Sequence, residues 1–257
     1  MLSLDLTGRR ALVTGGGQGV GRGIAFGLAA AGAEVVVNDL AHDRAQVVVD
    51  EIAAAGGTAT AAPFDVTDFA AVVAAVEAAG PIDVLVNNAG NAGAAGMASL
   101  APFVTTGPPD WDRYLQVNLY GVLHCCRAAM PGMVDRGWGR IVTIVSDAAR
   151  IGEKNLAVYG AAKAGAAALT RALALEGGKY GVTANNIALG TMRTPQTEPL
   201  WSDPSNPHAQ ALMQGYAVRR PGLPDDVAPL VVLLASEQGS WITGQTYPVN
   251  GGYSFAL

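Results

Sequence analysis

Short apolar runs alternate with longer alanine-rich stretches through the first part of the chain. The apolar runs are rich in β-branched residues, which predicts strands; they lie at 11–13, 34–37, 58–62 and 84–86. The stretches between them have the length and composition of helices; they cover 19–31, 44–55 and 69–79. This alternation predicts right-handed β-α-β units, and hence a parallel sheet with helices on both faces.

The alternation continues in the second half of the chain. A long helix is predicted over 109–136, a β-branched run ends at Ser146, a helix carries Tyr159 to about Tyr180, and a strand follows at 182–188. Neither a repeat nor a linker interrupts this order. With 257 residues, of which 50% are hydrophobic, the chain can bury one large core. We therefore expect an α/β protein with one domain over 1–257 and a doubly wound, Rossmann-like parallel sheet.

Two long loops interrupt the alternation of strands and helices, at 91–109 and 190–224, and both are rich in glycine and proline. The second contains a short helical piece at about 209–216. Loops of this length in a compact domain are usually functional, and both leave the carboxyl ends of strands, where an open α/β sheet places its ligand crevice. We predict that 190–224 is a substrate lid; a mobile surface excursion is the alternative.

The charge balance narrows the choice of partners. Only 14% of residues are charged and the net charge is −5, so no basic stripe is present for a nucleic acid or an anionic membrane. The N-terminus carries Asp5 and has no apolar core of signal-peptide length, and no uninterrupted apolar stretch reaches membrane-spanning length. Adjacent Cys125 and Cys126 are expected to be buried free thiols. We expect a cytoplasmic protein that acts on a small molecule, and we assign no metal ligands.

A glycine-rich turn follows the first strand and opens the first helix. Its sequence is Thr14-Gly15-Gly16-Gly17-Gln18-Gly19-Val20-Gly21. Glycines at this place let the backbone turn tightly and approach a pyrophosphate, which rests on the N–H groups at the helix N-terminus. The position between strand and helix therefore predicts a dinucleotide site.

Polar residues at other strand ends extend this site. Asp39 ends the second strand, where a carboxylate can accept from the adenosine ribose hydroxyls and would repel a 2′-phosphate, so we expect NAD rather than NADP. Arg22 and Arg44 are the nearby basic residues that would weaken this preference. Asp65-Val66 is placed beside the adenine, and Asn87-Asn88-Ala89-Gly90 forms a close-approach turn beside the same crevice.

Ser146, Tyr159 and Lys163 carry the candidate chemistry. Tyr159 and Lys163 are four residues apart, so they share one helical face, and Ser146 ends the strand before that helix. An unperturbed tyrosine has a pKa of about 10, and a close ammonium lowers that pKa. A hydroxyl, a phenol and an ammonium at one point are sufficient for proton transfer to or from an alcohol or ketone oxygen.

Taken together, five elements resemble the short-chain dehydrogenase/reductases over practically the whole chain: Thr14-Gly15-x-x-x-Gly19-x-Gly21, Asn87-Asn88-Ala89-Gly90, Asn118, Ser146 and Tyr159-x-x-x-Lys163. The resemblance implies that Tyr159 is the general acid/base. It implies that Lys163 lowers the pKa of Tyr159 and holds the nicotinamide ribose, that Ser146 hydrogen-bonds the substrate oxygen, and that Asn118 supports a proton relay. It also implies a homotetramer. The cofactor-binding set that we assign is Thr14, Gly15, Gln18, Gly19, Val20, Gly21, Asp39, Asp65, Val66, Asn88, Ala89, Gly90, Tyr159, Lys163, Gly190, Met192 and Thr194.

A narrower similarity and one departure refine this prediction. Pro102-Phe103-Val104 with Pro109-x-Trp111, Pro131-Gly132-Met133-Val134, and the segment from Ser146 to Gly152 resemble the 2-hydroxycyclohexanecarboxyl-CoA dehydrogenases, which oxidise a ring alcohol beside an acyl-CoA. The family commonly has a Pro-Gly pair where this chain has Leu189-Gly190.

We therefore predict NAD-dependent interconversion of a secondary alcohol and a ketone, with a cyclic alcohol or a hydroxyacyl-CoA as substrate. A 3-oxoacyl thioester reductase using NADPH is the alternative enzyme. A dinucleotide-binding regulator without turnover is the alternative of another class.

Overall fold

The computed structural model describes residues 4–91 and 101–255 and contains one seven-stranded parallel sheet. The strand order is β3-β2-β1-β4-β5-β6-β7. The strands are β1 (Arg10–Val13), β2 (Glu34–Val37), β3 (Thr58–Ala61), β4 (Val84–Asn87), β5 (Gly139–Ser146), β6 (Val182–Leu189) and β7 (Thr246–Val249). The chain therefore reverses its direction across the sheet between β1 and β4, which confirms the doubly wound α/β fold.

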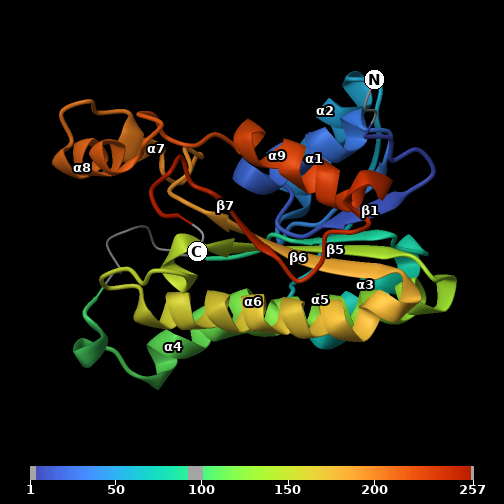
Figure 1. Ribbon diagram of the computed structural model, residues 1–257. Helices are drawn as coiled ribbons and strands as arrows, with labels where there is room; N and C mark the ends of the chain where they lie inside the picture. The colour runs from blue at the N-terminus through green and yellow to red at the C-terminus, as the bar shows by residue number, and fades with distance from the viewer. Residues whose placement is uncertain (1–3, 92–100, 256–257) are drawn as a thin grey trace.

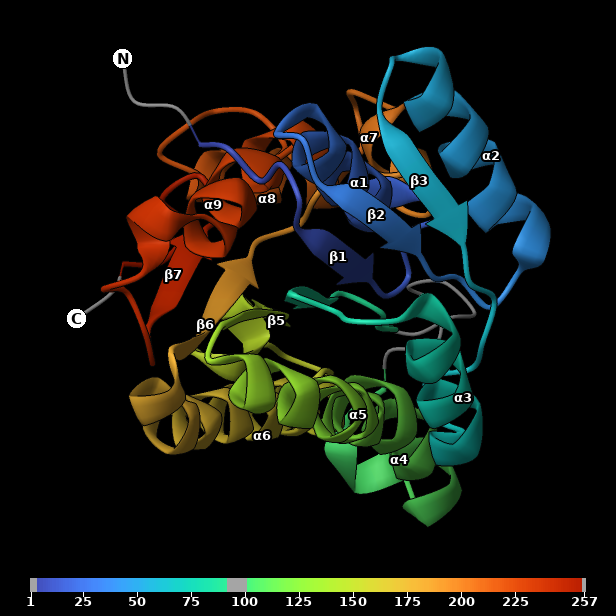
Figure 2. The ribbon, with the colours of Figure 1, turned by 90° about the vertical axis from the view of Figure 1, so that its right-hand side faces the viewer.

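Helices cover both faces of the sheet, as Figures 1 and 2 show. One layer contains α1 (Gly19–Ala30), α2 (His42–Ala54) and α9 (Pro224–Ala235), and the other contains α3 (Phe69–Ala79), α5 (Gly121–Arg136) and α6 (Ala157–Gly177). The short helices α4 (Pro108–Leu115), α7 (Glu198–Trp201) and α8 (Pro207–Gly215) lie at one end of the sheet. The bounds predicted for the helices agree with the observed bounds to within about two residues. The exceptions lie in the long loops and in the C-terminal part of the chain.

The two faces of the sheet carry separate hydrophobic clusters. Alternate residues of β1 and β2, such as Val13 and Val35, pack with Ile24 of α1 in one cluster, whereas Leu12 and Val36 pack in the other. This division follows from the strand geometry, because successive side chains point to opposite faces. Strands that are buried on both faces need apolar residues at every position, which explains their uninterrupted β-branched runs.

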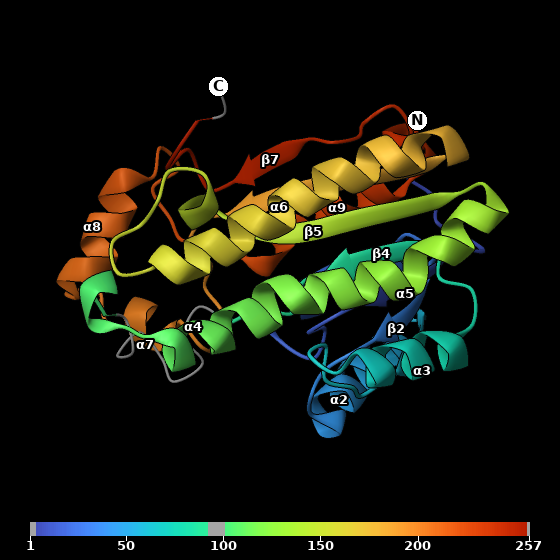
Figure 3. The ribbon, with the colours of Figure 1, turned by 90° about the horizontal axis from the view of Figure 1, so that it is seen from below.

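The predicted helix over 109–136 contains a change of helical pitch. Figure 3 shows that α4 runs on into α5. Residues Gln116–Tyr120 form a π-helical turn between them, and Asn118 is fully buried inside this turn. A π-turn leaves a backbone carbonyl without its usual partner, and here the Asn118 Nδ2 donates to the carbonyl of Tyr114 at 3.0 Å. The pitch change therefore turns the side chain of Asn118 toward the chain that follows β4.

Three elements were not predicted from the sequence: α7, α9 and β7. α9 is buried at Val227, Val231 and Leu234 and begins at Pro224, where the predicted loop ended; no element was predicted from the sequence for the residues that follow. β7 pairs with β6 and contains Pro248, which is tolerated because β7 is the edge strand of the described sheet. Residues 92–100 of the predicted loop 91–109 lie outside the described residues.

Close packing between α1 and α9 fixes the helix that carries the glycine turn. A Cβ atom on Gly23 would lie 2.6 Å from Pro224 Cβ, and one on Gly27 would lie 2.8 Å from Ala228 Cβ. Both distances are far below a normal carbon contact, so glycine at these positions permits the approach of the two helices.

We predict that Gly23→Ala lowers the free energy of unfolding by about 1–3 kcal/mol, because the added methyl group must push α1 away from α9. Gly178→Ala is the matched control: Gly178 has helical backbone angles, and a Cβ atom there would have nothing within 4 Å. Urea denaturation measures both variants. Equal stability of the two would show that the α1–α9 contact does not require glycine.

Candidate active site

The site begins where β1 and β4 end side by side. The Thr14 hydroxyl accepts hydrogen bonds from the backbone N–H groups of Asn88 and Ala89, each at 3.0 Å. The Asn88 Nδ2 donates to the carbonyls of Thr14 and Gly15 at 2.9 and 3.0 Å. The glycine turn and the turn after β4, which the sequence assigned separately to the cofactor, are therefore one hydrogen-bonded unit.

The backbone of the glycine turn has the properties that a dinucleotide requires. Gly15 and Gly19 have positive φ angles of 62° and 54°, which favour glycine. Gln18 is the N-cap of α1 but makes no side-chain cap, so its side chain does not cover the first N–H groups of the helix. An uncapped helix N-terminus behind a tight turn fits a pyrophosphate. Val20 and Gly21 follow inside the first turn of α1, and Gly21 is buried.

Asn38 is a site residue that the sequence analysis missed. Its side chain is buried and links three segments: Oδ1 accepts from the N–H of Gly15 at 3.3 Å, and Nδ2 donates to the carbonyls of Ala62 and Phe64 at 3.1 and 3.0 Å. The available signal was a polar residue directly after the apolar run of β2. Asn38 therefore holds the glycine turn against the end of β3.

Asp39 lies against the glycine turn. Its carboxylate is 4% exposed, and a Cβ atom on Gly17 would lie 2.6 Å from Asp39 Oδ2. Arg44 donates to Asp39 Oδ1 from Nη2 at 2.5 Å and from Nε at 3.1 Å. Arg22, the other nearby cation, pairs with Glu51 at 2.8 Å. Both arginines that could attract a 2′-phosphate are thus paired with carboxylates, and the partner of Arg44 is Asp39, the residue proposed to bind the ribose.

Ser146 and Tyr159 meet because α6 begins directly against the turn after β5. A Cβ atom on Gly160 would lie 2.8 Å from the carbonyl oxygen of Ala148, so only glycine permits this contact. Ser146 Oγ accepts from the N–H of Ala148 at 3.2 Å, and the Ser146 hydroxyl is hydrogen-bonded to the Tyr159 phenol. The ring of Tyr114 lies edge-on to Tyr159, with 6.4 Å between the centroids.

Lys163 and Asn118 both lie close to Gly90. A Cβ atom on Gly90 would lie 2.9 Å from Asn118 Oδ1 and 3.1 Å from Lys163 Nζ. Lys163 is 4% exposed and its ammonium donates to the carbonyl of Ile144 at 2.9 Å. Asn118 Oδ1 accepts from the N–H of Asn91 at 3.2 Å, and its Nδ2 donates to the Asn91 carbonyl at 3.0 Å. The structure thus brings the four predicted catalytic side chains to one edge of the sheet, and Asn91 joins them.

The pKa of Tyr159 moves in the direction opposite to that implied by the family resemblance. Burial raises the pKa of Tyr159 to about 12, the hydrogen bond with Ser146 lowers it, and the negative charge of Glu153 raises it. Burial lowers the pKa of Lys163 to about 8. In the protein alone, desolvation therefore dominates the pKa of both groups.

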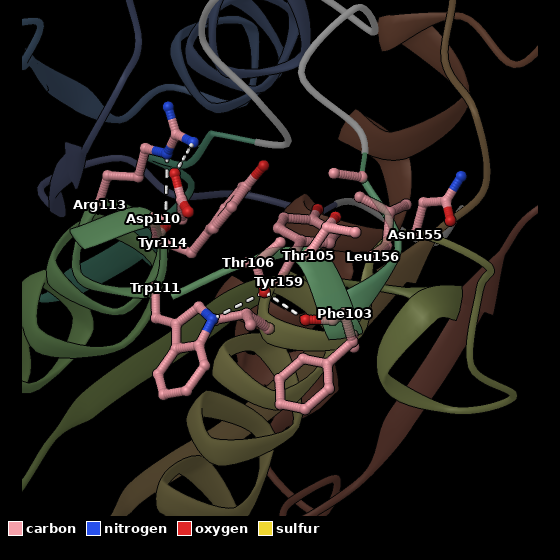
Figure 4. Close-up of a pocket in the computed structure, with 13 residues that line it drawn as sticks. Phe103, Thr105, Thr106, Asp110, Trp111, Arg113, Tyr114, Asn155, Leu156 and Tyr159 are labelled. Atoms are coloured by element: carbon pink, nitrogen blue, oxygen red, sulfur yellow. Dashed lines mark hydrogen bonds and ion pairs between the residues drawn. The ribbon is translucent and has the colours of Figure 1, made fainter. Parts of the chain in front are cut away.

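A pocket of about 210 Å³ opens beside Tyr159, and Figure 4 shows its lining. Phe103 and Trp111 stack in one wall with 5.6 Å between centroids and an interplanar angle of 13°. Trp111 Nε1 donates to the hydroxyl of Thr106 at 2.9 Å. The charged lining residues, Asp110 and Arg113, pair with each other at 2.9 Å. The pocket thus offers aromatic and hydroxyl surface beside the phenol.

The remaining predicted cofactor residues lie in three places. Thr194 contacts the glycine turn, since a Cβ atom on Gly19 would lie 3.3 Å from Thr194 Cγ2. Gly190 packs on Asn250, and Met192 is buried beside Gly222; both line a second pocket of about 340 Å³. Asp65 is exposed and accepts from the N–H of Thr67, whereas Val66 is buried in the core.

Other sequence predictions have simple outcomes. Cys125 and Cys126 are buried free thiols, as expected, and burial raises the pKa of both. Leu189, at the usual proline position, ends β6 and packs in the core. Beyond these predictions, Trp201 packs with Leu200 and Tyr216 in a separate cluster around α7 and α8. Within residues 4–91 and 101–255, no helix is both long and apolar enough to cross a membrane.

Comparison with known proteins gives a consistent result. A family model described as enoyl-(acyl carrier protein) reductase matches residues 15–254. A 2-keto-3-deoxy-L-fuconate dehydrogenase from Xanthomonas campestris pv. campestris is 37% identical and covers 97% of this chain and 81% of the relative. A (hydroxy(phenyl)methyl)succinyl-CoA dehydrogenase subunit from Thauera aromatica is 36% identical and covers 98% of both chains. A solved 3-oxoacyl-(acyl-carrier-protein) reductase from Agrobacterium tumefaciens C58 with NADP bound is 31% identical, with a TM-score of 0.90 over 98% of this chain and 96% of that one.

The chain belongs to the short-chain dehydrogenase/reductase family, which confirms the resemblance drawn from the five sequence elements. It is a nicotinamide dinucleotide-dependent oxidoreductase that acts on CH–OH groups. The substrates of its relatives differ, from a sugar acid to an aryl-substituted acyl-CoA.

We predict that Lys163 makes a contribution to stability that rises between pH 8 and pH 10, measured against the Lys163→Met variant. Its folded-state pKa, about 8, lies below its ordinary value of 10.5, so the unfolded state binds more protons in this interval. Stability is lost as the pH falls from 10.5 to 8 and is constant below that. The gain from pH 8 to pH 10 is about 2 kcal/mol relative to Lys163→Met, which carries no charge. Urea denaturation at both pH values tests this; identical pH slopes for the two proteins would contradict it.

Proposed function

We propose that this protein oxidises a secondary alcohol on or next to a ring to the ketone, with NAD as hydride acceptor, and catalyses the reverse reaction. The convergence of Ser146, Tyr159, Lys163 and Asn118 beside an aromatic-walled pocket carries this proposal. When bound, the dinucleotide supplies the hydride acceptor. The substrate hydroxyl lies between Ser146 and Tyr159, and its proton passes to the Tyr159 phenolate as the carbinol carbon loses hydride.

The other residues prepare this proton transfer. Lys163 follows Tyr159 by one helical turn on the same face of α6. An ammonium near the phenol would oppose the rise in the Tyr159 pKa that burial causes. Asn118 lies in the π-turn beside Gly90 and is held by Asn91. A water-linked proton relay would run from Asn118 to Lys163. Positioning of the alcohol against the acceptor supplies a large part of the acceleration.

The pocket favours a neutral ring over an anionic substrate. Phe103 and Trp111 present aromatic surface, and Arg113 is paired with Asp110. Three of the four arginines that could meet CoA phosphates are also paired with carboxylates: Arg150 with Asp147 at 2.8 Å, Arg193 with Glu198 at 2.6 Å and Arg220 with Asp226 at 2.6 Å. The fourth, Arg219, donates to the carbonyl of Gln214. A hydroxyacyl-CoA remains the second candidate, supported by the Thauera aromatica relative. The segment 190–224 is proposed as the lid over this substrate.

The preference for NAD rests on Asp39. Its carboxylate lies against Gly17 and would meet the adenosine ribose, where a 2′-phosphate would add negative charge. A 3-oxoacyl thioester reductase using NADPH is the alternative within enzymes, and a similar solved structure with that activity has NADP bound. A regulator without turnover would be supported by dinucleotide binding without activity on any alcohol or ketone.

We propose a homotetramer in the cytoplasm. Ala161 and Ala168 are exposed along α6, and Leu175 is 86% exposed, so this helix presents a small and apolar face. Trp241, which precedes the edge strand β7, is 97% exposed. Apolar surface of this kind fits subunit contacts. The buried free thiols fit a reducing compartment.

Tyr159→Phe is expected to lower kcat for alcohol oxidation by about 10²- to 10⁴-fold, because the proton acceptor is removed while the ring is kept. Binding of NAD, measured by the quenching of tryptophan fluorescence, should change far less than kcat, because the other assigned cofactor contacts are kept. Tyr180→Phe, at an exposed tyrosine beyond α6, is the control and should keep full activity. The assay measures NADH formed from a panel of cyclohexanols, steroid alcohols and hydroxyacyl-CoA thioesters. Full turnover by Tyr159→Phe would remove Tyr159 as the acid/base.

Asp39→Ala is expected to shift the ratio of kcat/KM for NAD over NADP at least about tenfold toward NADP, because Arg44 loses its carboxylate and becomes available to a 2′-phosphate. Arg44→Gln is the comparison variant, and it should not improve the use of NADP. A wild-type protein that prefers NADP would overturn the assignment of NAD and favour the thioester reductase.

A further inference from the structure

A buried carboxylate directly follows the proposed substrate-binding serine, and the mechanism does not use it. Asp147 has an exposed fraction of 0% and begins the 3-10 turn η4 (Asp147–Ala149), whose next N–H donates to Ser146 Oγ. A buried charge is costly unless it is paired and fully hydrogen-bonded. The hydrogen-bond partners of Asp147 therefore indicate the role of this buried carboxylate.

Most of these partners come from the far end of the sequence. Asp147 Oδ2 accepts from Asn250 Nδ2 at 2.7 Å, and Oδ1 accepts from the hydroxyl of Ser254 at 3.0 Å. Arg150 completes the cluster: its Nη1 donates to Asp147 Oδ1 and to Ser254 Oγ, each at 2.8 Å, and its Nη2 donates to the carbonyl of Phe255 at 2.9 Å. In Figure 1 the end of the chain accordingly lies beside the turn that follows β5.

The same C-terminal segment also contacts the proposed lid. Tyr253 lies edge-on to Tyr216 with 5.5 Å between ring centroids, and a Cβ atom on Gly215 would lie 2.9 Å from the Tyr253 ring. The N–H of Val218 donates to the carbonyl of Gly251 at 2.9 Å. Tyr216 in turn accepts at its hydroxyl from the N–H of Thr191 at 3.1 Å, at the start of the lid. Residues 250–255 thus touch both the serine turn and the lid.

We propose that Asp147 is a positioning residue: it docks the C-terminal segment 250–255 onto the serine turn and thereby holds Ser146 in register with Tyr159 and with the lid. This inference rests on the proposed function, in which Ser146 holds the substrate oxygen. Asp147 touches neither substrate nor cofactor, and it acts through the backbone of η4. The geometry of the reacting groups therefore depends on whether residues 250–255 are docked, although Asn250 is 103 residues away from Asp147 in sequence.

The first experiment measures this coupling without any substrate, by hydrogen exchange of the wild type and its variants. Truncation after Gly252 should accelerate exchange at Ala148, Arg150 and Ile151, whose N–H groups are bonded within the serine turn. Asp147→Asn should accelerate exchange at Gly252 and Tyr253 in the opposite segment. Ser254→Ala, a milder change in the same cluster, should produce the same effect at smaller amplitude. Effects confined to the mutated segment would overturn the proposal.

The second experiment uses the alcohol from the panel that the wild type oxidises fastest. Asp147→Asn and the truncated protein should each lower kcat by about 10- to 100-fold, the range expected for a small misplacement of a reacting group, with KM for NAD unchanged within about twofold. The double variant should be no slower than the slower single variant, because both changes break one linkage. Asp50→Asn, an exposed acid on α2 that accepts from Gln46, should leave kcat unchanged.

The two readouts separate the possible failures. Coupled exchange with unchanged kcat, or additive losses in the double variant, would show that the cluster only stabilises the fold and would overturn the positioning role. If the wild type oxidised no alcohol in the panel, the proposed function would fail, while the exchange experiment would still decide whether the chain end and the serine turn are coupled.

Discussion

Parallel pairing of the strands is the constraint on which the rest of this structure depends. All seven strands end at the same edge, so the chain must place its polar residues and its turns there. The hydrogen bonds of Thr14 with Asn88 and Ala89 join two of these ends, and Asn38 joins a third. The glycine turn, the proposed catalytic side chains and the pocket beside Tyr159 gather at this edge, where an open α/β sheet places its ligand crevice.

Glycine determines how closely the elements of the site approach one another. Gly90 leaves room for Asn118 and Lys163, Gly160 lets α6 start on the serine turn, and Gly17 lies against the Asp39 carboxylate. In each place a methyl group would occupy the space of a polar atom or backbone atom of another element. The proposed acid/base geometry therefore depends on residues that take no part in proton transfer.

Electrostatics of the site depend on desolvation as much as on charge. Burial raises the pKa of Tyr159 and lowers that of Lys163, so the protein alone holds both groups closer to neutrality than water would. In the proposed mechanism, a phenolate at this position would need further stabilisation, which the Lys163 ammonium and a bound oxidised dinucleotide would supply. Carboxylates pair with Arg44, Arg113 and Arg150. Arg113 is the arginine among the described residues that line the proposed substrate pocket, and its charge is balanced by Asp110 rather than available to an anionic ligand.

The sequence by itself determined the alternation of strands and helices, the glycine turn and the shared face of Tyr159 and Lys163, because these are properties of residues close together in the chain. The catalytic and cofactor roles of the residues stay predictions, but the places of Ser146, Asp39 and Thr14 at strand ends followed from the same local patterns. Only the tertiary structure decided the partners of Asn38, the π-turn that buries Asn118, and the pairing of Arg44 with Asp39. It also decided that Asp147 meets Asn250 and Ser254. These contacts depend on how strands pair and how helices pack over long separations, and no short pattern in the sequence encodes that arrangement.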